Sequence, residues 1–284
     1  MDNFSKIKNF SLDLVFPRFC FGCQKEGTYL CNDCRSLLDI SEFNYCLCDR
    51  NPQQLLPQQK SGKPFGTAQG KCNRCQNKIL SGLYFALPYK EKQLTKKLIH
   101  NFKYKPYIKD LAETLSSVLI EHFIKTNKNT NEIWENSVLV PVPLDKTKLK
   151  IRGYNQSAEL AKELAKVLQI PVVSDVLIKV KHTDSQMELS KVEREKNLQG
   201  VFAISPTRHS GESQNPECLQ CSWIPGPRLL GGQEARNDSE DLYGKKIFLV
   251  DDVYTTGATM QECAKILKES GAKQVWGIAI AREG

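Results

Sequence analysis

A chain of 284 residues is long enough for one large domain, or for an ordinary domain with a smaller module attached. Its apolar fraction of 40% and charged fraction of 25% are typical of a soluble globular protein and exclude a disordered or fibrous chain. The formal net charge of +8 favours anionic partners, from phosphorylated metabolites to nucleic acid. Without a run of about 18 apolar residues or an export signal, we expect a cytoplasmic protein rather than a membrane or secreted one.

Cysteines occur in pairs along residues 1–80. The eight candidate metal ligands are Cys20, Cys23, Cys31, Cys34, Cys46, Cys48, Cys72 and Cys75. Two CxxC turns can aim four sulfurs at one ion, and Gly22 lies where the backbone must approach sulfur closely. We therefore predict a zinc-ribbon-like module with structural Zn2+ over residues 1–80, rather than the disulfide framework of a secreted chain.

The last four of these cysteines are less regular than the first four. Cys46 and Cys48 form a CxC, one residue shorter than the usual pair, and a long polar stretch separates them from Cys72 and Cys75. Either these four bind a second zinc ion through an irregular turn, or the pairs interleave with those of the first set. The sequence leaves both arrangements open.

A basic segment rich in aromatic residues follows the cysteines. It contains Tyr89, Lys90, Lys92, Lys96, Lys97, Phe102, Lys103, Tyr104, Lys105, Tyr107 and Lys109. Such a mixture is compatible with a surface for single-stranded nucleic acid. It is equally compatible with a solvated helix face whose aromatic residues lie in the core.

From about residue 83 the pattern changes to helices that alternate with short apolar strands. Apolar residues recur at helical spacing over 111–119 and 160–168, whereas 137–142, 246–250 and 274–281 are typical of buried strands. This alternation predicts an α/β domain over residues 83–284, with a parallel sheet and helices on both faces. Ligands of such domains bind beyond the carboxyl ends of the strands.

The stretch FLVDDVYTTGAT places two acids at that position, Asp251 and Asp252. After them, a turn into a helix consists of Thr255, Thr256, Gly257, Ala258 and Thr259. Adjacent carboxylates suit the vicinal hydroxyls of a ribose and can help hold hydrated Mg2+. The turn offers amides and hydroxyls to a phosphate, so we predict a ribose 5-phosphate site. A helix merely capped by Thr255 is the alternative, but it leaves the acid pair unexplained.

This stretch resembles the phosphoribosyl-pyrophosphate (PRPP) signature of type I phosphoribosyltransferases, in which the acids contact the ribose and the loop holds the 5-phosphate. More of the chain is similar to the ComF family, in the segments LIHNFKYK, VLVPVPL, RGYNQSAELA and QMELSKVEREKNLQGVF. The resemblance implies PRPP and Mg2+ as ligands. It also implies a zinc module joined to a phosphoribosyltransferase domain.

The resemblance extends to further site residues. It implies that Arg152, Asn155 and Gln156 begin a helix beside the site, and that a segment able to cover the pyrophosphate contains Gln186, Arg194 and Asn197. Lys103 is another candidate for the same anion, because arginine, lysine and amide donors stabilise pyrophosphate. No residue is identified as a general base, and no motif reveals an acceptor substrate.

Residues 205–241 depart from the family pattern. They are rich in proline, glycine and polar residues, so we expect a disordered insertion, in which the pair Cys218 and Cys221 is incidental. The resemblance implies a competence-associated, PRPP-binding protein that acts in DNA uptake. The alternatives are a nucleotide-salvage phosphoribosyltransferase, and a non-catalytic module that senses PRPP or engages single-stranded DNA or a competence helicase.

Overall fold

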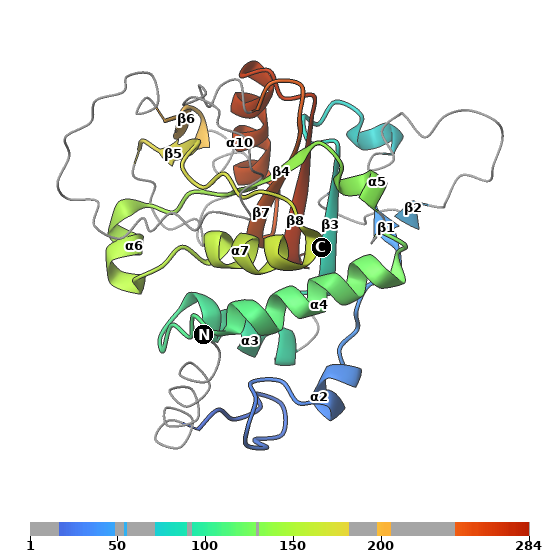
Figure 1. Cartoon of the computed structure of the whole chain (residues 1–284), viewed down its shortest axis with the longest axis vertical. Coiled ribbons are helices and arrows are strands. Elements are labelled where there is room, and N and C mark those ends of the chain that lie inside the picture. The colour runs from blue at the N-terminus through green and yellow to red at the C-terminus, as the bar shows by residue number, and fades with distance from the viewer. Residues whose placement is uncertain are drawn as a thin grey trace, which may run out of the picture.

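A computed structural model describes residues 17–48, 54–55, 72–89, 93–128, 131–181, 198–205 and 242–283. Within these residues, four parallel strands form one sheet in the order β3–β8–β7–β4 (Figure 1). The strands are β3 (Gly82–Pro88), β4 (Ser137–Pro141), β7 (Lys246–Tyr254) and β8 (Gln274–Arg282). The predicted parallel α/β sheet is therefore confirmed, and β3 adds a strand that the sequence pattern did not reveal.

Helices cover both faces of this sheet, as predicted. Side chains alternate between faces along a strand, so Phe248 and Val250 of β7 pack with α3 (Gln93–Lys103), α4 (Leu111–Lys125) and α7 (Gln156–Leu168). Ile247 and Leu249 pack on the opposite face with α10 (Ala258–Glu269). In Figure 1, α4 and α7 run below the strands, and α10 stands beside them.

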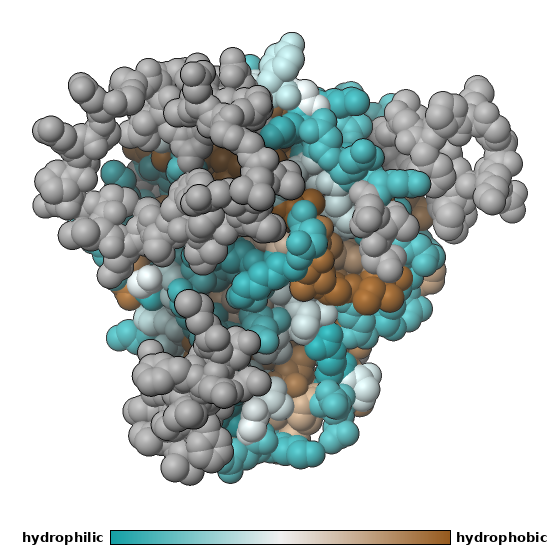
Figure 2. All heavy atoms as spheres, in the orientation of Figure 1, coloured by the Kyte–Doolittle hydropathy of each residue, from teal (hydrophilic) through white to brown (hydrophobic). Residues whose placement is uncertain are grey.

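The remaining described elements are short. They are α2 (Asn32–Ser36), β1 (Asn44–Tyr45), β2 (Gln54–Leu55), the 3-10 turn η1 (Asn73–Cys75), α5 (Asn131–Trp134), α6 (Lys146–Arg152), β5 (Leu177–Lys179) and β6 (Phe202–Ile204). β5 and β6 pair as an antiparallel ribbon. On the face shown in Figure 2 the described surface is mostly hydrophilic, with hydrophobic residues gathered right of the centre. None of the described helices is both long and apolar enough to cross a bilayer.

β7 is longer than the predicted strand. The sequence pattern placed its end at residue 250 and the acid pair beyond it, but the strand continues to Tyr254. The ladder with β8 explains the extension, because Asp251 pairs with Ala279 and Tyr254 with Arg282. Both acids therefore lie on the last part of a strand, which fixes their backbone more firmly than a loop would.

The two groups of cysteines belong to different hydrophobic clusters. Cys20, Cys31 and Cys34 share a hydrophobic cluster with side chains of α3, α4 and α7. Cys46 and Cys75 are buried in the other cluster, together with side chains of α10. The domain boundary near residue 80 stays a prediction.

Candidate functional site

Asp252 is the more deeply buried acid of the pair, with 3% of its surface exposed. Lys103, the last residue of α3, donates to its Oδ1 at 2.9 Å. Gln156, the first residue of α7, donates to its Oδ2 at 3.1 Å. A buried carboxylate needs both a counter-charge and hydrogen-bond donors, and these two side chains provide them. Burial alone would lower the pKa of Lys103, but the charges of the two acids outweigh it and raise that pKa.

Asp251 is held differently. Its Oδ1 accepts from the hydroxyl of Ser157 at 3.0 Å and from the backbone N–H of Asp252 at 2.8 Å. Burial, followed by repulsion from Asp252, raises the pKa of Asp251 to about 7, against the lowering effect of Lys103 and of these hydrogen bonds. This carboxyl group is therefore set to change its charge near neutral pH.

The start of α7 carries two of the donors to the acids, Gln156 and Ser157. Asn155 caps the helix, because its side chain accepts from the backbone N–H of Ser157 at 3.1 Å. The same side chain donates to the carbonyl of Val142, just after β4, at 3.0 Å. The resemblance correctly placed Asn155 and Gln156 at the start of this helix. It was wrong for Arg152, which ends the preceding helix α6.

Arg152 nevertheless faces the site. Its Nε and Nη1 atoms are buried and have no hydrogen-bond partner among the described residues. Burial lowers the pKa of Arg152, and the charge of Asp252 opposes this change. A guanidinium group in this state is a natural partner for an anion, since it gains hydrogen bonds when one binds.

Residues 255–257 link β7 to α10, whose first two residues are Ala258 and Thr259. Gly257 is the N-cap, with φ of 78°, and no side chain caps the helix there. Thr255 as the cap, the alternative reading of the sequence, is therefore wrong. Thr256 accepts from the backbone N–H of Ala258 at 3.3 Å. The first turn thus presents backbone N–H groups and the positive end of the helix dipole beside the acid pair.

Tyr254 explains why this turn needs a glycine. A Cβ atom on Gly257 would lie 2.2 Å from the hydroxyl oxygen of Tyr254 and 2.4 Å from its Cζ. The Tyr254 ring is only 1% exposed, so it packs directly beneath the turn. The sequence alone gave no role to Tyr254 or to Ser157, although both stand inside the segments FLVDDVYTTGAT and RGYNQSAELA.

Some predicted residues lie outside the described part of the chain. These are Gln186, Arg194 and Asn197 of the covering segment, Lys90 and Lys92 of the basic segment, and the insertion with Cys218 and Cys221. Their proposed roles stay predictions. Thr259, in the first turn of α10, is within the described site.

Eight cysteines form two separate clusters. The first cluster consists of Cys20, Cys23, Cys31 and Cys34, and the second cluster of Cys46, Cys48, Cys72 and Cys75. Within each, the four Sγ atoms lie within 4.8 Å of one another. This arrangement decides between the two open possibilities, because the pairs do not interleave.

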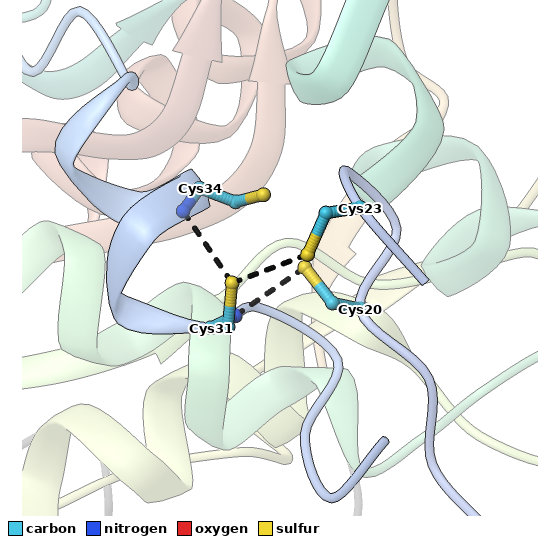
Figure 3. A group of neighbouring side chains, drawn as sticks. All are labelled: Cys20, Cys23, Cys31 and Cys34. Carbon is cyan, nitrogen blue, oxygen red and sulfur yellow. Dashed lines mark hydrogen bonds between the residues drawn. The ribbon is translucent and has the colours of Figure 1, made fainter. Parts of the chain in front are cut away.

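The geometry of both clusters fits a zinc ion. Figure 3 shows the four sulfurs of the first cluster pointing toward one another. The Sγ atoms of Cys23 and Cys31 lie 3.5 Å apart. The Sγ atoms of Cys48 and Cys72 in the second cluster are separated by the same distance. A tetrahedral ion with Zn–S bonds of about 2.3 Å holds its sulfurs about 3.8 Å apart, so little adjustment is required.

Backbone contacts favour a thiolate at Cys20, whereas burial and the neighbouring sulfurs raise the pKa of Cys34 and Cys75. The N–H of Cys31 donates to Cys20 Sγ at 3.4 Å, and that of Cys72 to Cys75 Sγ at 3.2 Å. Burial would raise the pKa of Cys20, but nearby backbone N–H groups lower it to about 6. As predicted for Gly22, a Cβ there would lie 2.4 Å from the sulfur of Cys34. Each cluster can therefore bind a metal such as zinc.

Comparison with known proteins agrees with this site. Residues 155–283, which contain the start of α7, the acid pair and the turn into α10, match the phosphoribosyl transferase domain. The protein therefore carries a domain of this class. Its fold, a parallel sheet with helices on both faces, is consistent with the type I phosphoribosyltransferases.

The relatives define the protein more narrowly. It is 29% identical over 160 residues to Competence protein F of Haemophilus influenzae, a match that covers 56% of each chain. It is 27% identical over 259 residues to DNA utilization protein YhgH of Salmonella typhi, or 87% of this chain and 95% of that protein. A segment of 38 residues is 53% identical to Competence protein ComFC of Streptococcus pneumoniae and covers 17% of it. The chain is thus similar to proteins named for competence and for DNA utilization, in agreement with the resemblance seen in its sequence.

Proposed function

We propose that this protein binds PRPP at the end of β7 and acts in the use of incoming DNA. The observation that carries the proposal is the acid pair, which Lys103, Gln156 and Ser157 hold beside the start of α10, where the N-cap Gly257 has no side chain. A fold that needed only a stable core would not bury two neighbouring carboxylates beside such a turn.

The parts of PRPP match the parts of the site. The carboxylates of Asp251 and Asp252 can accept hydrogen bonds from the ribose hydroxyls, and the amides of residues 257–259 can donate to the 5-phosphate. The buried guanidinium of Arg152 suits the pyrophosphate, whose dense charge favours an arginine fork. Its Nη1 and Nε atoms would gain the partners that they lack among the described residues.

Magnesium is expected to arrive with the pyrophosphate. Carboxylates are ligands that Mg2+ prefers, but Asp252 already accepts from Lys103 and Gln156 through both oxygens. The second oxygen of Asp251 is better placed to contact the hydration shell of such an ion. Bound Mg2+ would supply charge neutralisation of the pyrophosphate.

Whether the protein transfers the phosphoribosyl group depends on an acceptor. If it does, Asp251 and Asp252 orient the ribose, while Arg152 stabilises the pyrophosphate as it leaves C1. A purine or pyrimidine that supports turnover would identify a salvage enzyme. Binding without turnover would instead identify a PRPP sensor.

Calorimetry tests the binding site. Full-length protein is titrated with PRPP and Mg2+, next to the variant Asp251→Asn/Asp252→Asn and the control Asp110→Asn, which changes an exposed acid outside the site. We expect wild type and Asp110→Asn to bind alike and the double variant to lose binding. Equal binding by the double variant would contradict the site assignment.

Single-stranded DNA is a second candidate ligand. The names of the relatives refer to competence and DNA utilization, and α3 presents Lys96 and Lys97 to solvent. Just beyond α3, Tyr104 is 45% exposed, and its ring centroid lies 5.1 Å from that of His100. Exposed rings beside lysines are what base stacking and phosphate contacts require.

Salt dependence distinguishes the two ligands. DNA binding by this face should weaken steeply as salt rises, fall in Tyr104→Ala, and persist in Asp251→Asn/Asp252→Asn. If the acid-pair variant loses DNA binding while Tyr104→Ala keeps it, the surface has been assigned wrongly. The competence helicase stays a predicted partner.

A further inference from the structure

Arg282 lies between the second cluster and the turn at residues 255–259. It is the last residue of β8, is 2% exposed, and contacts the second cluster and Tyr254, the residue that precedes the turn. We propose that Arg282 couples the two, so that metal bound at the second cluster and PRPP bound at the turn stabilise each other. This inference rests on the proposed function and makes Arg282 a positioning residue, because it does not touch the ligand itself.

On one side, Arg282 contacts the backbone of the second cluster. Its Nη1 donates to the carbonyl of Cys46 at 2.7 Å, and its Nη2 donates to the carbonyl of Cys48. These two carbonyls flank Leu47 in the short CxC, whose path depends on where the two sulfurs are held. A metal ion that fixes the sulfurs therefore also fixes the acceptors that a buried guanidinium needs.

On the other side, Arg282 supports the turn through Tyr254. The guanidinium carbon lies 5.6 Å from the centroid of the Tyr254 ring and 5.5 Å from that of Phe85, within the range of a cation–π contact. Tyr254 and Arg282 are also partners in the β7–β8 ladder. Since the Tyr254 ring packs directly beneath Gly257, a shift of Arg282 would move the floor of the turn.

The first cluster provides the contrast. Its helix α2 carries Arg35, which donates to Glu121 Oε2 at 2.9 Å and to Ser117 Oγ at 2.7 Å, both on α4. Arg35 thus attaches the first cluster to the outer side of a helix, with no contact to the turn among the described residues. The two clusters resemble each other in ligands but differ in what their arginine joins.

Coupling of this kind must be reciprocal. If metal at the second cluster favours PRPP binding, then PRPP must retain that metal by the same factor. Couplings between binding sites are typically about 5-fold to 150-fold. Retention of zinc is therefore a readout that does not depend on any catalytic activity.

The test measures the equilibrium partition of zinc between the full-length protein and a zinc-selective chelator, with and without saturating PRPP and Mg2+. In wild type, PRPP should raise the affinity for one zinc ion by about five-fold or more and leave the other unchanged. In Arg282→Lys, which keeps the charge but lacks the planar fork that spans both carbonyls and stacks on the rings, PRPP should bind more weakly and protect neither ion. In the matched control Arg35→Lys, the protection should remain.

The wild-type comparison needs no substitution, so misfolding of a variant cannot hide the result. The coupling is overturned if wild type binds PRPP without protecting either ion, or if Arg282→Lys protects as wild type does. A wild-type protein that binds no PRPP in parallel calorimetry overturns the proposed function, and the coupling with it.

Discussion

Gly257 allows the sharpest test of how the turn is built. Its φ of 78° is a left-handed conformation. For a residue with a Cβ atom, this conformation is less stable by about 1–2 kcal/mol. A methyl group there would also overlap Tyr254, whose buried ring has no open space to move into. Overpacking of this kind costs about 1–3 kcal/mol. We therefore expect Gly257→Ala to lower the free energy of unfolding by about 2–5 kcal/mol.

Gly244→Ala is the matched control. Gly244 has φ of 70°, but nothing lies within 4 Å of the Cβ that it would gain. Gly244→Ala should therefore lower the free energy of unfolding only by the cost of the left-handed backbone, about 1–2 kcal/mol. Urea denaturation measures both values, and calorimetry should show weaker PRPP binding for Gly257→Ala alone. If the two variants are equally stable and bind PRPP equally, Tyr254 does not form the floor of the turn.

Three further predictions concern the acids and the metals. Lys103→Met should lower the free energy of unfolding by about 1–3 kcal/mol, because it leaves Asp252 buried without its cation. Lys109→Met, which removes an exposed lysine from its pair with Glu159, should change that free energy by less than about 1 kcal/mol. Urea denaturation measures both values. The raised pKa of Asp251 means that the native state binds more protons than the unfolded state between pH 3.8 and about 7. The free energy of unfolding should then fall as pH rises through this range, while PRPP affinity should rise as the Asp251 carboxylate forms. Denaturation follows the first trend and calorimetry the second, and Asp251→Asn should abolish both. Metal analysis should find two zinc ions per chain, one of which is lost with stability in Cys20→Ser; a full metal content in that variant would contradict the first cluster.

Local patterns were enough to predict three of the four strands of the sheet and to propose a site at the end of β7. Apolar runs such as FLV before Asp251 mark strands buried on both faces, and the two CxxC pairs of the first cluster lie close together in sequence. A glycine just past a helix is a local stop signal of the same kind, and Gly271, with φ of 92°, follows the C-cap Ser270 of α10. These features depend on neighbours within a few residues.

Contacts between distant segments could not be predicted in the same way. Lys103 is 149 residues from Asp252, and Ser157 is 94 residues from Asp251, so no spacing links them. The length of β7 was underestimated because carboxylates are unfavourable in strands, and only the ladder with β8 holds them there. The pairing of the second cluster likewise required its packing against the sheet.

The most direct test of the PRPP site is to observe the amides of the turn. In a two-dimensional NMR titration with PRPP and Mg2+, the backbone N–H signals of Gly257, Ala258 and Thr259 should shift most, because they donate to the 5-phosphate. Ribose 5-phosphate should shift the same three signals. Pyrophosphate alone should shift these signals less than the side-chain Nε–H signal of Arg152. If PRPP binds and these three amides do not move, the ligand is held elsewhere and the account is wrong.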